Sequence, residues 1–249
     1  IAGRYIQIHV YPFTLSEAKE ISLQNGKFIS DNDLFADYLR YGGLPLRFSL
    51  EEISVEPYLS DTYDAIVVKD IIQRNKLKDS NILNLLLVFL MDNIGNPFSA
   101  RSIAASLTSS GIKTSVDMVL TYLDYIKSAM IVNSVQRYDL KGKKLLASTE
   151  KYYAVDLGLR NAIKTSNEPD FNKLYENIVY LELLSRGYAA HTAKTDDYNI
   201  YFLAQKRNDP IYHLECYLLS TPLHIHPKIG TRHEMTHITP QYLLPRTIP

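Results

Sequence analysis

The sequence has one cysteine, no tryptophan and no excess of either charge among its 249 residues. The single cysteine, Cys216, excludes an internal disulfide framework and is typical of a protein of the reducing cytoplasm. Basic and acidic side chains each number 27, so no overall electric field favours nucleic acid or an anionic membrane. Any binding to nucleic acid therefore has to come from a local group of basic residues.

Long apolar runs are also missing. The longest, residues 82–91, is interrupted by Asn84 and is far shorter than the roughly 20 residues that span a bilayer. We therefore interpret it as a buried helix, and we expect a cytoplasmic protein with no membrane partner. No signal peptide is apparent. The hydrophobic content of 46% is sufficient for a packed core.

A phosphate-binding loop is absent as well. The motif G-x-x-x-x-G-K-[ST] supplies consecutive backbone N–H groups and a lysine to the phosphates, and it occurs nowhere in the chain. Gly26-Lys27 and Gly142-Lys143 lack the upstream glycine and the following hydroxyl, so we interpret them as turn glycines beside solvated lysines. This chain is therefore expected neither to bind nor to hydrolyse ATP, and no small-molecule substrate is evident.

What is present is a mixed α/β (α+β) pattern, which we divide into five units. Residues 1–58 begin with a strand-like run at 5–10 and hold two short helices, 17–24 and 33–41. Residues 59–79 form a helical connector. Residues 80–165 and 166–220 form two modules, and in the second a helix at 173–185 precedes strand-like runs. Residues 221–249 are rich in proline and histidine without a sustained period, and we expect a poorly ordered tail.

The 80–165 module has the element order of a winged helix-turn-helix. A buried helix at 82–91 is followed by a helix at 101–107, capped by Ser99, and by a longer helix at 116–129, capped by Thr114 or Ser115. An alternating strand at 131–138 and a return strand at 144–155 then form a hairpin. This order predicts that the 116–129 helix is the recognition helix and the hairpin is the wing.

The wing carries a local excess of positive charge, which suits contact with DNA phosphates. Its five basic residues are Arg137, Lys141, Lys143, Lys144 and Lys151, against the two acids Asp139 and Glu150. The recognition helix carries Asp117 and Asp124 and lacks the Arg, Asn or Gln that reads base edges. Specific readout is therefore not expected, and two alternatives stay open: non-specific DNA contact, and a scaffold that binds protein.

Several phrases of the sequence together resemble one large family of bacterial and archaeal AAA+ ATPases. The phrases are Ala2-Gly3-Arg4-Tyr5, Tyr11-Pro12-Phe13, Tyr41-Gly42-Gly43-Leu44-Pro45, Lys69-Asp70-Ile71-Ile72, Lys151 to Arg160, Glu176 to Leu183, and Arg186-Gly187-Tyr188. The resemblance implies a P-loop ATPase followed by a winged helix and a C-terminal domain of unknown function with a restriction-endonuclease-like fold. Residues 1–58 would then be a remnant of the ATPase domain with its following helices.

The resemblance also implies that the ATPase core lies before Ile1, so that ATP and magnesium would be cofactors only of that missing core. The chain opens at Ile1, directly in strand-like sequence, and we expect it to be a partial chain. For this piece we expect no cofactor.

In the endonuclease-like fold, the resemblance implies a metal site built from a helix Glu, a strand Asp and a further acidic or amide position. Glu176 matches the helix position. The strand phrase Glu-apolar-Asp-Phe reads here as Asn199-Ile200-Tyr201-Phe202, and the next-strand position is Leu214. Glu215 is shifted by one residue and so belongs to the opposite face. We expect a degenerate domain with Glu176 as a structural residue; a metal-dependent nuclease is the alternative.

The tail contains His233-Glu234-Met235-Thr236-His237, which fits H-E-x-x-H. On a helix, His233 and His237 would share a face and hold zinc with Glu234 as the base, which predicts a zinc peptidase as a further alternative. Gly230 and Pro240 leave little room for that helix, so a polar tail is the preferred interpretation. The tail also departs from the family, and a frame-shifted reading frame would explain it.

These expectations combine into a non-catalytic C-terminal region of an AAA+ ATPase, whose winged helix binds DNA non-specifically or binds a protein partner.

Overall fold

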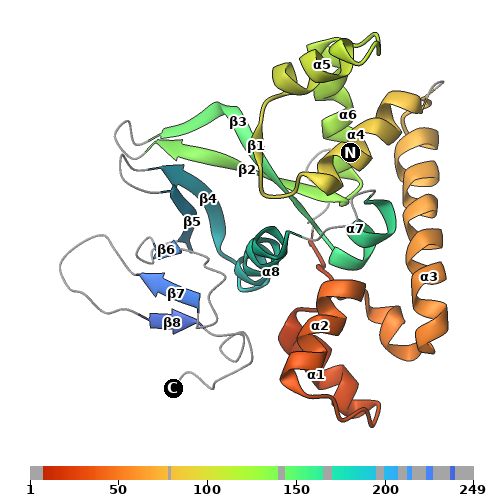
Figure 1. Cartoon of the computed structure of the whole chain (residues 1–249), viewed down its shortest axis with the longest axis vertical. Coiled ribbons are helices and arrows are strands. Elements are labelled where there is room, and N and C mark those ends of the chain that lie inside the picture. Colours follow the sequence, from red (N-terminus) through yellow and green to blue (C-terminus); the bar gives the residue numbers. More distant parts are fainter. Residues whose placement is uncertain are drawn as a thin grey trace.

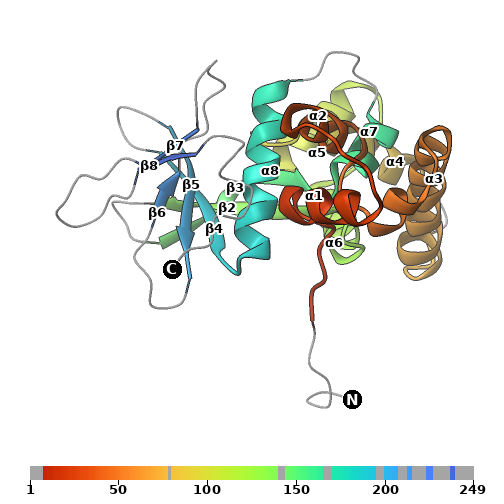
Figure 2. The same ribbon diagram turned by 90° about the horizontal axis from the view of Figure 1, so that it is seen from below.

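The computed structural model describes residues 8–77, 80–139, 144–164, 170–194, 199–206, 212–214, 223–226 and 236–238. They form a mixed α+β structure with helices on one side, a twisted sheet on the other, and α8 (Phe171–Ser185) between them (Figures 1 and 2). The other α-helices are α1 (Leu15–Gln24), α2 (Asp31–Tyr41), α3 (Glu52–Ala65), α4 (Asn81–Asp92), α5 (Ala100–Ser109), α6 (Val116–Ser128) and α7 (Leu157–Ile163). The strands are β1 (Pro97–Phe98), β2 (Val132–Asp139), β3 (Lys144–Ala154), β4 (Ala189–Lys194), β5 (Asn199–Gln205), β6 (Tyr212–Leu214), β7 (Leu223–His226) and β8 (Thr236–Ile238).

The described end of the N-terminal segment is not part of the strand expected at residues 5–10. Residues 8–10 have no regular structure, and residues 5–7 lie outside the described part of the chain. Ile8 and Val10 are exposed, and none of the described strands lies beside these residues. An alternating pattern without a partner strand buries too little surface to hold a strand.

The two expected N-terminal helices are confirmed. Thr14 caps α1 through a capping box with Glu17, and the Ser30 hydroxyl accepts a hydrogen bond from the backbone N–H of Asp33 at the start of α2. A 3₁₀ turn, η1 (Pro45–Ser49), leads into α3, which continues directly as a π-helical segment, η2 (Ile66–Gln73). The boundary that we drew between residues 58 and 59 therefore falls inside α3.

The central helix α4 is the buried helix that the apolar run predicted. Leu83, Leu86, Leu87 and Leu90 have no exposed surface. They belong to the largest hydrophobic cluster, which joins α1, α2, α4, α5 and α6. Full burial of such a side chain stabilises the fold by about 1.5–3 kcal/mol. This helix therefore holds the helical side of the molecule together.

The helices and hairpin expected for the 80–165 module are all present. Ser99 caps α5 and Ser115 caps α6, each accepting a hydrogen bond from a backbone N–H three residues further on. The hairpin of β2 and β3 has a register shift between Gln136 and Arg137. The short strand β1 adds to the outer edge of β3, where Pro97 lies opposite Lys151.

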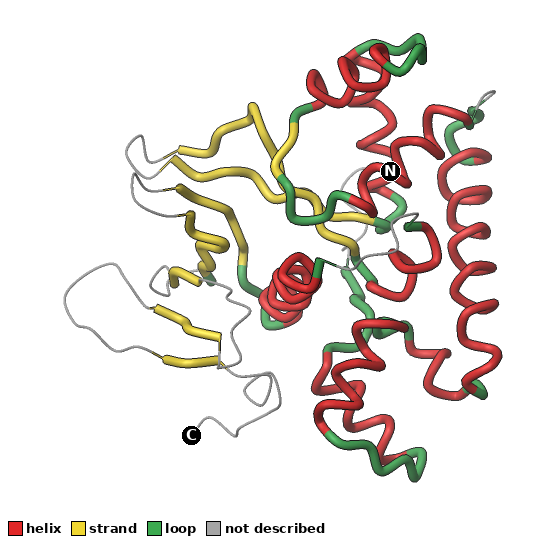
Figure 3. Tube along the Cα trace, viewed as in Figure 1, coloured by secondary structure: helices red, strands yellow, loops and turns green. Residues whose placement is uncertain are grey.

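All the described strands belong to one sheet with the order β1-β3-β2-β4-β5-β6-β7-β8 (Figure 3). The β2–β4 pair is parallel, with Arg137 opposite Thr192 and Tyr138 opposite Ala193, and all the other pairs are antiparallel. The hairpin and the strands after α8 are therefore one continuous sheet. The boundary drawn between residues 165 and 166 does not divide it.

Helix α8 covers this sheet across that boundary. The Tyr180 ring stacks on Tyr153 of β3 with the ring centroids 4.6 Å apart, and it stacks on Phe202 of β5 at 5.9 Å. These rings belong to a second hydrophobic cluster between helix and sheet. Two strands of the tail, β7 and β8, extend the sheet at the far edge. Within the described residues, no helix combines the length and the apolar character needed to cross a membrane.

Candidate functional site

The five basic residues expected on the wing do not form one accessible group. Arg137 lies in β2, where its side chain is half-buried and its Nε is buried without a hydrogen-bond partner. Lys144 begins β3 opposite Asp139. Lys141 and Lys143 lie outside the described residues. Lys151 points to the interior, which does not fit the DNA contact expected of it.

Lys151 is bound to Glu176 rather than free for a phosphate. Its Nζ lies 2.6 Å from Oε1 of Glu176, and the lysine side chain is 16% exposed. The carboxylate of Glu176 is buried and accepts a second hydrogen bond of 2.6 Å from the Tyr153 hydroxyl. Lys173 follows at 3.6 Å from Oε2. A lysine held in a buried ion pair cannot reach a DNA backbone without breaking that pair.

The partners of Glu176 are side chains of β3 and of its own helix, α8. With Lys151 and Lys173 beside it, the carboxylate faces two ammonium groups where a divalent cation would need further oxygen ligands. Within the described part of the chain, no group of three or more His, Cys, Asp or Glu side chains could hold a metal ion. The arrangement ties α8 to β3.

The neighbouring residue, Asn177, strengthens the same contact. Its amide oxygen accepts from the backbone N–H of Ala154 at 2.8 Å, and its amide nitrogen donates to the Ala154 carbonyl at 2.9 Å. All these groups are buried. The side chain thus satisfies both backbone groups of the last residue of β3, as a neighbouring strand would do.

The remaining positions of the expected nuclease site lie on two paired strands. Asn199 and Tyr201 belong to β5 and Leu214 to β6, and the register places Phe202 opposite Leu214. In chain order α8 is followed by β4, β5 and β6, but the hydrogen-bond and ion-pair partners of Glu176 lie on β3 and α8 rather than at these positions. Glu215 lies outside the described residues.

The last two residues of the H-E-x-x-H motif, Thr236 and His237, lie in a strand and not in a helix. Thr236–Ile238 is the strand β8, in which His237 lies opposite His224 of β7. His233 and Glu234 are outside the described residues. The expectation that His233 and His237 share a helical face is therefore wrong at His237, because the chain is extended there and the i,i+4 geometry of a helix does not apply.

Helix α6 presents an apolar and acidic face outward. Val119, Leu123 and Ile126 are buried, whereas the apolar Val116 and Leu120 of the same helix are exposed, Leu120 by 48%. Asp117 and Asp124 are exposed with them. Lys127 forms an ion pair with Asp124, with the two atoms 2.8 Å apart. The outward face therefore offers little positive charge to DNA.

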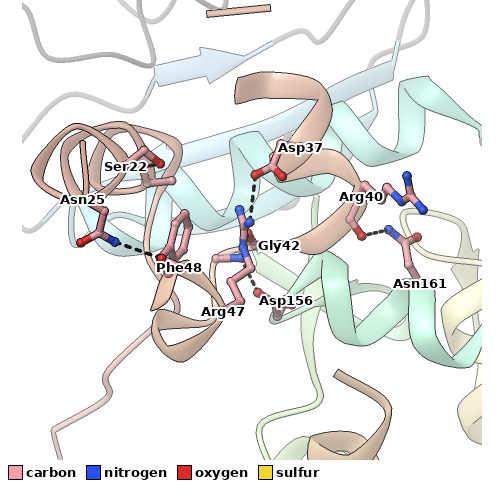
Figure 4. Close-up of polar contacts among 11 residues, drawn as sticks. Ser22, Asn25, Asp37, Arg40, Gly42, Arg47, Phe48, Asp156 and Asn161 are labelled. Atoms are coloured by element: carbon pink, nitrogen blue, oxygen red, sulfur yellow. Dashed lines mark hydrogen bonds and ion pairs between the residues drawn. The ribbon is translucent and has the colours of Figure 1, made fainter. Parts of the chain in front are cut away.

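A buried junction that sequence reasoning did not predict joins the N-terminal helices to α7 (Figure 4). Asp156 caps α7: one carboxylate oxygen accepts from the Leu159 N–H at 2.9 Å, and the other accepts from the Gly43 N–H at 2.7 Å. Burial raises the pKa of Asp156, while the hydrogen bonds from Leu159 and Gly43 oppose that shift. Arg47, itself buried, donates to the Gly42 carbonyl at 2.7 Å and to Asp37 at 2.8 Å.

The junction leaves no room for larger residues. A Cβ added to Gly43 would lie 2.1 Å from the carbonyl oxygen of Phe13, and one added to Gly158 would lie 2.2 Å from that of Tyr41. Asn161 donates to the carbonyls of Leu39 and Arg40 at 2.9 and 2.8 Å, which closes the end of α2 onto α7 (Figure 4). The signal in the sequence was an Asp before a short apolar helix, which is typical of an N-cap.

The sequence matches one family model and is similar to proteins of a bacterium and an archaeon. The model of a domain of unknown function, DUF8612, matches residues 32–170. An uncharacterized protein of Haemophilus influenzae is 34% identical over 215 residues, which is 85% of this chain and 53% of that protein. An uncharacterized protein of Methanocaldococcus jannaschii is 24% identical over 232 residues, 88% of this chain and 52% of its own length. The chain thus spans about half the length of these relatives, and no solved structure matches it.

Proposed function

The chain belongs to the DUF8612 family, and we propose that it is the non-catalytic, partner-binding region of a longer AAA+ ATPase. The two relatives are each about twice as long as the matched part, which leaves room for a separate ATPase domain. ATP and magnesium would be cofactors of that domain only.

The positions of the resembling phrases support this proposal. Tyr41-Gly42-Gly43 meets the Val155 to Arg160 phrase at Asp156, and Tyr11-Pro12-Phe13 reaches the same point because the Phe13 N–H donates to the Gly43 carbonyl at 2.8 Å. Phrases that lie far apart in the chain thus form one tightly packed junction. The close approaches there exclude larger residues at Gly43 and Gly158.

The elements of the hairpin module support a winged-helix architecture, and the surface of α6 favours protein over DNA as its partner. DNA affinity comes mainly from basic side chains on phosphates. The outward face of α6 carries Asp117, Asp124 and the apolar Leu120, and Lys151 is occupied by Glu176. Exposed apolar side chains are typical of the centre of a protein interface, and acidic side chains repel DNA phosphates. This acidic and apolar face is the observation that carries the proposal.

An endonuclease-like ancestry of the α8–β6 part is supported by the succession of one helix and three antiparallel strands. The pairing of Glu176 with Lys151 favours a part that has kept the architecture without metal-dependent cleavage. We therefore propose neither nuclease nor zinc peptidase activity for this chain.

A crosslinking experiment tests the partner. A photoreactive p-benzoylphenylalanine in place of Leu120 is expected to crosslink to protein in cells, and the same group at Val68, which is 44% exposed on η2, serves as the matched control. Fluorescence anisotropy with a random-sequence duplex at about 150 mM salt is expected to give a Kd weaker than about 10⁻⁴ M. Tight, salt-dependent duplex binding that is lost on Arg137→Gln would overturn the proposal in favour of DNA.

The ATPase parentage has its own test. The full-length H. influenzae relative is expected to hydrolyse ATP, whereas this chain is expected to show no change in mant-ATP fluorescence. A full-length relative without hydrolysis would remove the AAA+ assignment and leave the partner-binding proposal standing.

A further inference from the structure

A cavity of about 600 Å³ lies between α2, α3, α7 and α8, on elements that the proposed partner face does not use. This volume is within the range of small-molecule sites. Its walls are mostly apolar, with Ala36 and Leu39 from α2, Leu59 from α3, and Phe171 and Leu174 from α8. Burial against such walls favours an apolar ligand.

The cavity is preformed because the helices around it are fixed to one another. Asn161 of α7 holds the last carbonyls of α2, and Gly158 lets α7 approach the Tyr41 carbonyl more closely than any other residue would. Both residues line the cavity. A ligand therefore meets walls that need no rearrangement, which lowers the entropic cost of binding.

The charges of the lining are not balanced. Arg40 and Glu56 form an ion pair with the atoms 2.8 Å apart, so they neutralise each other. Lys164, which follows α7, also lines the cavity and makes no ion pair within the described residues. Burial, followed by repulsion from Arg160, lowers the pKa of Lys164, while Asp92 opposes the shift. An anion beside this lysine would relieve that penalty.

We propose that this cavity binds a small amphipathic anion, an apolar chain ending in one carboxylate. The chain would pack against Leu39, Leu59 and Leu174, and the carboxylate would pair with Lys164. Charge complementarity selects an anion over a neutral or cationic ligand, because Lys164 is the lining charge that forms no ion pair within the described residues.

Decanoate, kept below its micelle concentration, is the probe, with decanol as the uncharged equivalent and butyrate as the short one. Calorimetry on the full chain is expected to show saturable binding of one decanoate, tighter than either comparison. Lys164→Gln is expected to weaken decanoate about five- to tenfold and to leave decanol unchanged. Lys113→Gln, at an exposed lysine before α6, is the matched control and is expected to change neither.

Ala162→Trp places a large ring at an exposed position of the lining and is expected to abolish binding of both ligands. Thermal melting establishes that each variant is folded, and Ser60→Trp on the facing helix replaces Ala162→Trp if that variant does not fold. Three results would each overturn the proposal. They are no saturable decanoate binding by the unmodified chain, unchanged decanoate affinity in Lys164→Gln, and full binding by the variant with the filled cavity.

Discussion

Replacing Gly158 by alanine is expected to destabilise the protein, against the usual effect of this change in a helix. Gly158 is in the first turn of α7, where alanine ordinarily stabilises by up to about 0.5–1 kcal/mol. Here the new Cβ would lie 2.2 Å from the carbonyl oxygen of Tyr41 and 2.6 Å from its carbonyl carbon. Carbon and oxygen normally stay at least about 3.3 Å apart, so α2 and α7 must separate by about 1 Å.

The size of the effect follows from what that separation breaks. The clash is between the new Cβ and a backbone carbonyl, so no rotation of a side chain can relieve it. Forcing an extra methyl into a packed region costs about 1–3 kcal/mol. A shift of α2 also strains the hydrogen bond from Gly43 to Asp156, worth about 1 kcal/mol. After the helical gain is subtracted, we expect Gly158→Ala to lower the free energy of unfolding by about 2 kcal/mol.

Urea denaturation followed by far-UV circular dichroism measures this difference. Ala162→Gly, at an exposed position of the same helix, calibrates the helical propensity and is expected to cost about 0.5–1 kcal/mol. Amide hydrogen exchange at Gly43 should become faster in Gly158→Ala and stay unchanged in Ala162→Gly. A Gly158→Ala protein as stable as the unmodified chain would refute the view that the junction is rigid.

Three further changes test the contacts around α8 and the sheet. Asn177→Ala leaves both buried backbone groups of Ala154 unpaired and is expected to cost about 2–4 kcal/mol in urea denaturation. Asn177→Asp is expected to cost at least as much, because it sets a buried carboxylate against the Ala154 carbonyl. Lys151→Met strands the Glu176 carboxylate and is expected to cost about 3–5 kcal/mol, much of which a second change, Glu176→Gln, should restore; an unaltered single variant would contradict the buried pair. Burial lowers the pKa of His191, so the folded state resists its protonation, and stability is expected to fall as pH drops below about 6.5. His191→Gln should remove that part of the pH dependence, and identical pH profiles of the two proteins would argue against it.

Local order was predictable from the sequence where caps and apolar periods coincide. Ser99 and Ser115 mark the starts of α5 and α6 because a hydroxyl before a helix satisfies a free N–H. The burial of α4 was also predictable, because a nearly continuous apolar run leaves little polar face for solvent. On α6 the sequence does not tell the buried Val119, Leu123 and Ile126 from the exposed Val116 and Leu120, because which apolar residues find neighbours depends on the tertiary fold.

The candidate site was much less predictable, because its contacts join residues that are distant in sequence. Lys151 and Glu176 are 25 positions apart, and Gly43 and Asp156 are 113 apart. Charge counting along the hairpin treated Lys151 as a surface base, since nothing within the hairpin signals the carboxylate of α8. That Asn199 and Tyr201 are not acidic is readable from the sequence itself, because it needs no distance between residues.

The parallel pairing of β2 with β4 decides how the molecule can be cut for expression. A fragment ending after the hairpin would expose the inner edge of β2, and a fragment beginning at α8 would expose that of β4. Bare, flat strand edges recruit other copies of themselves. Each half is therefore expected to aggregate or form mixed oligomers, whereas a span that contains both β2 and β4 keeps the two edges paired with each other.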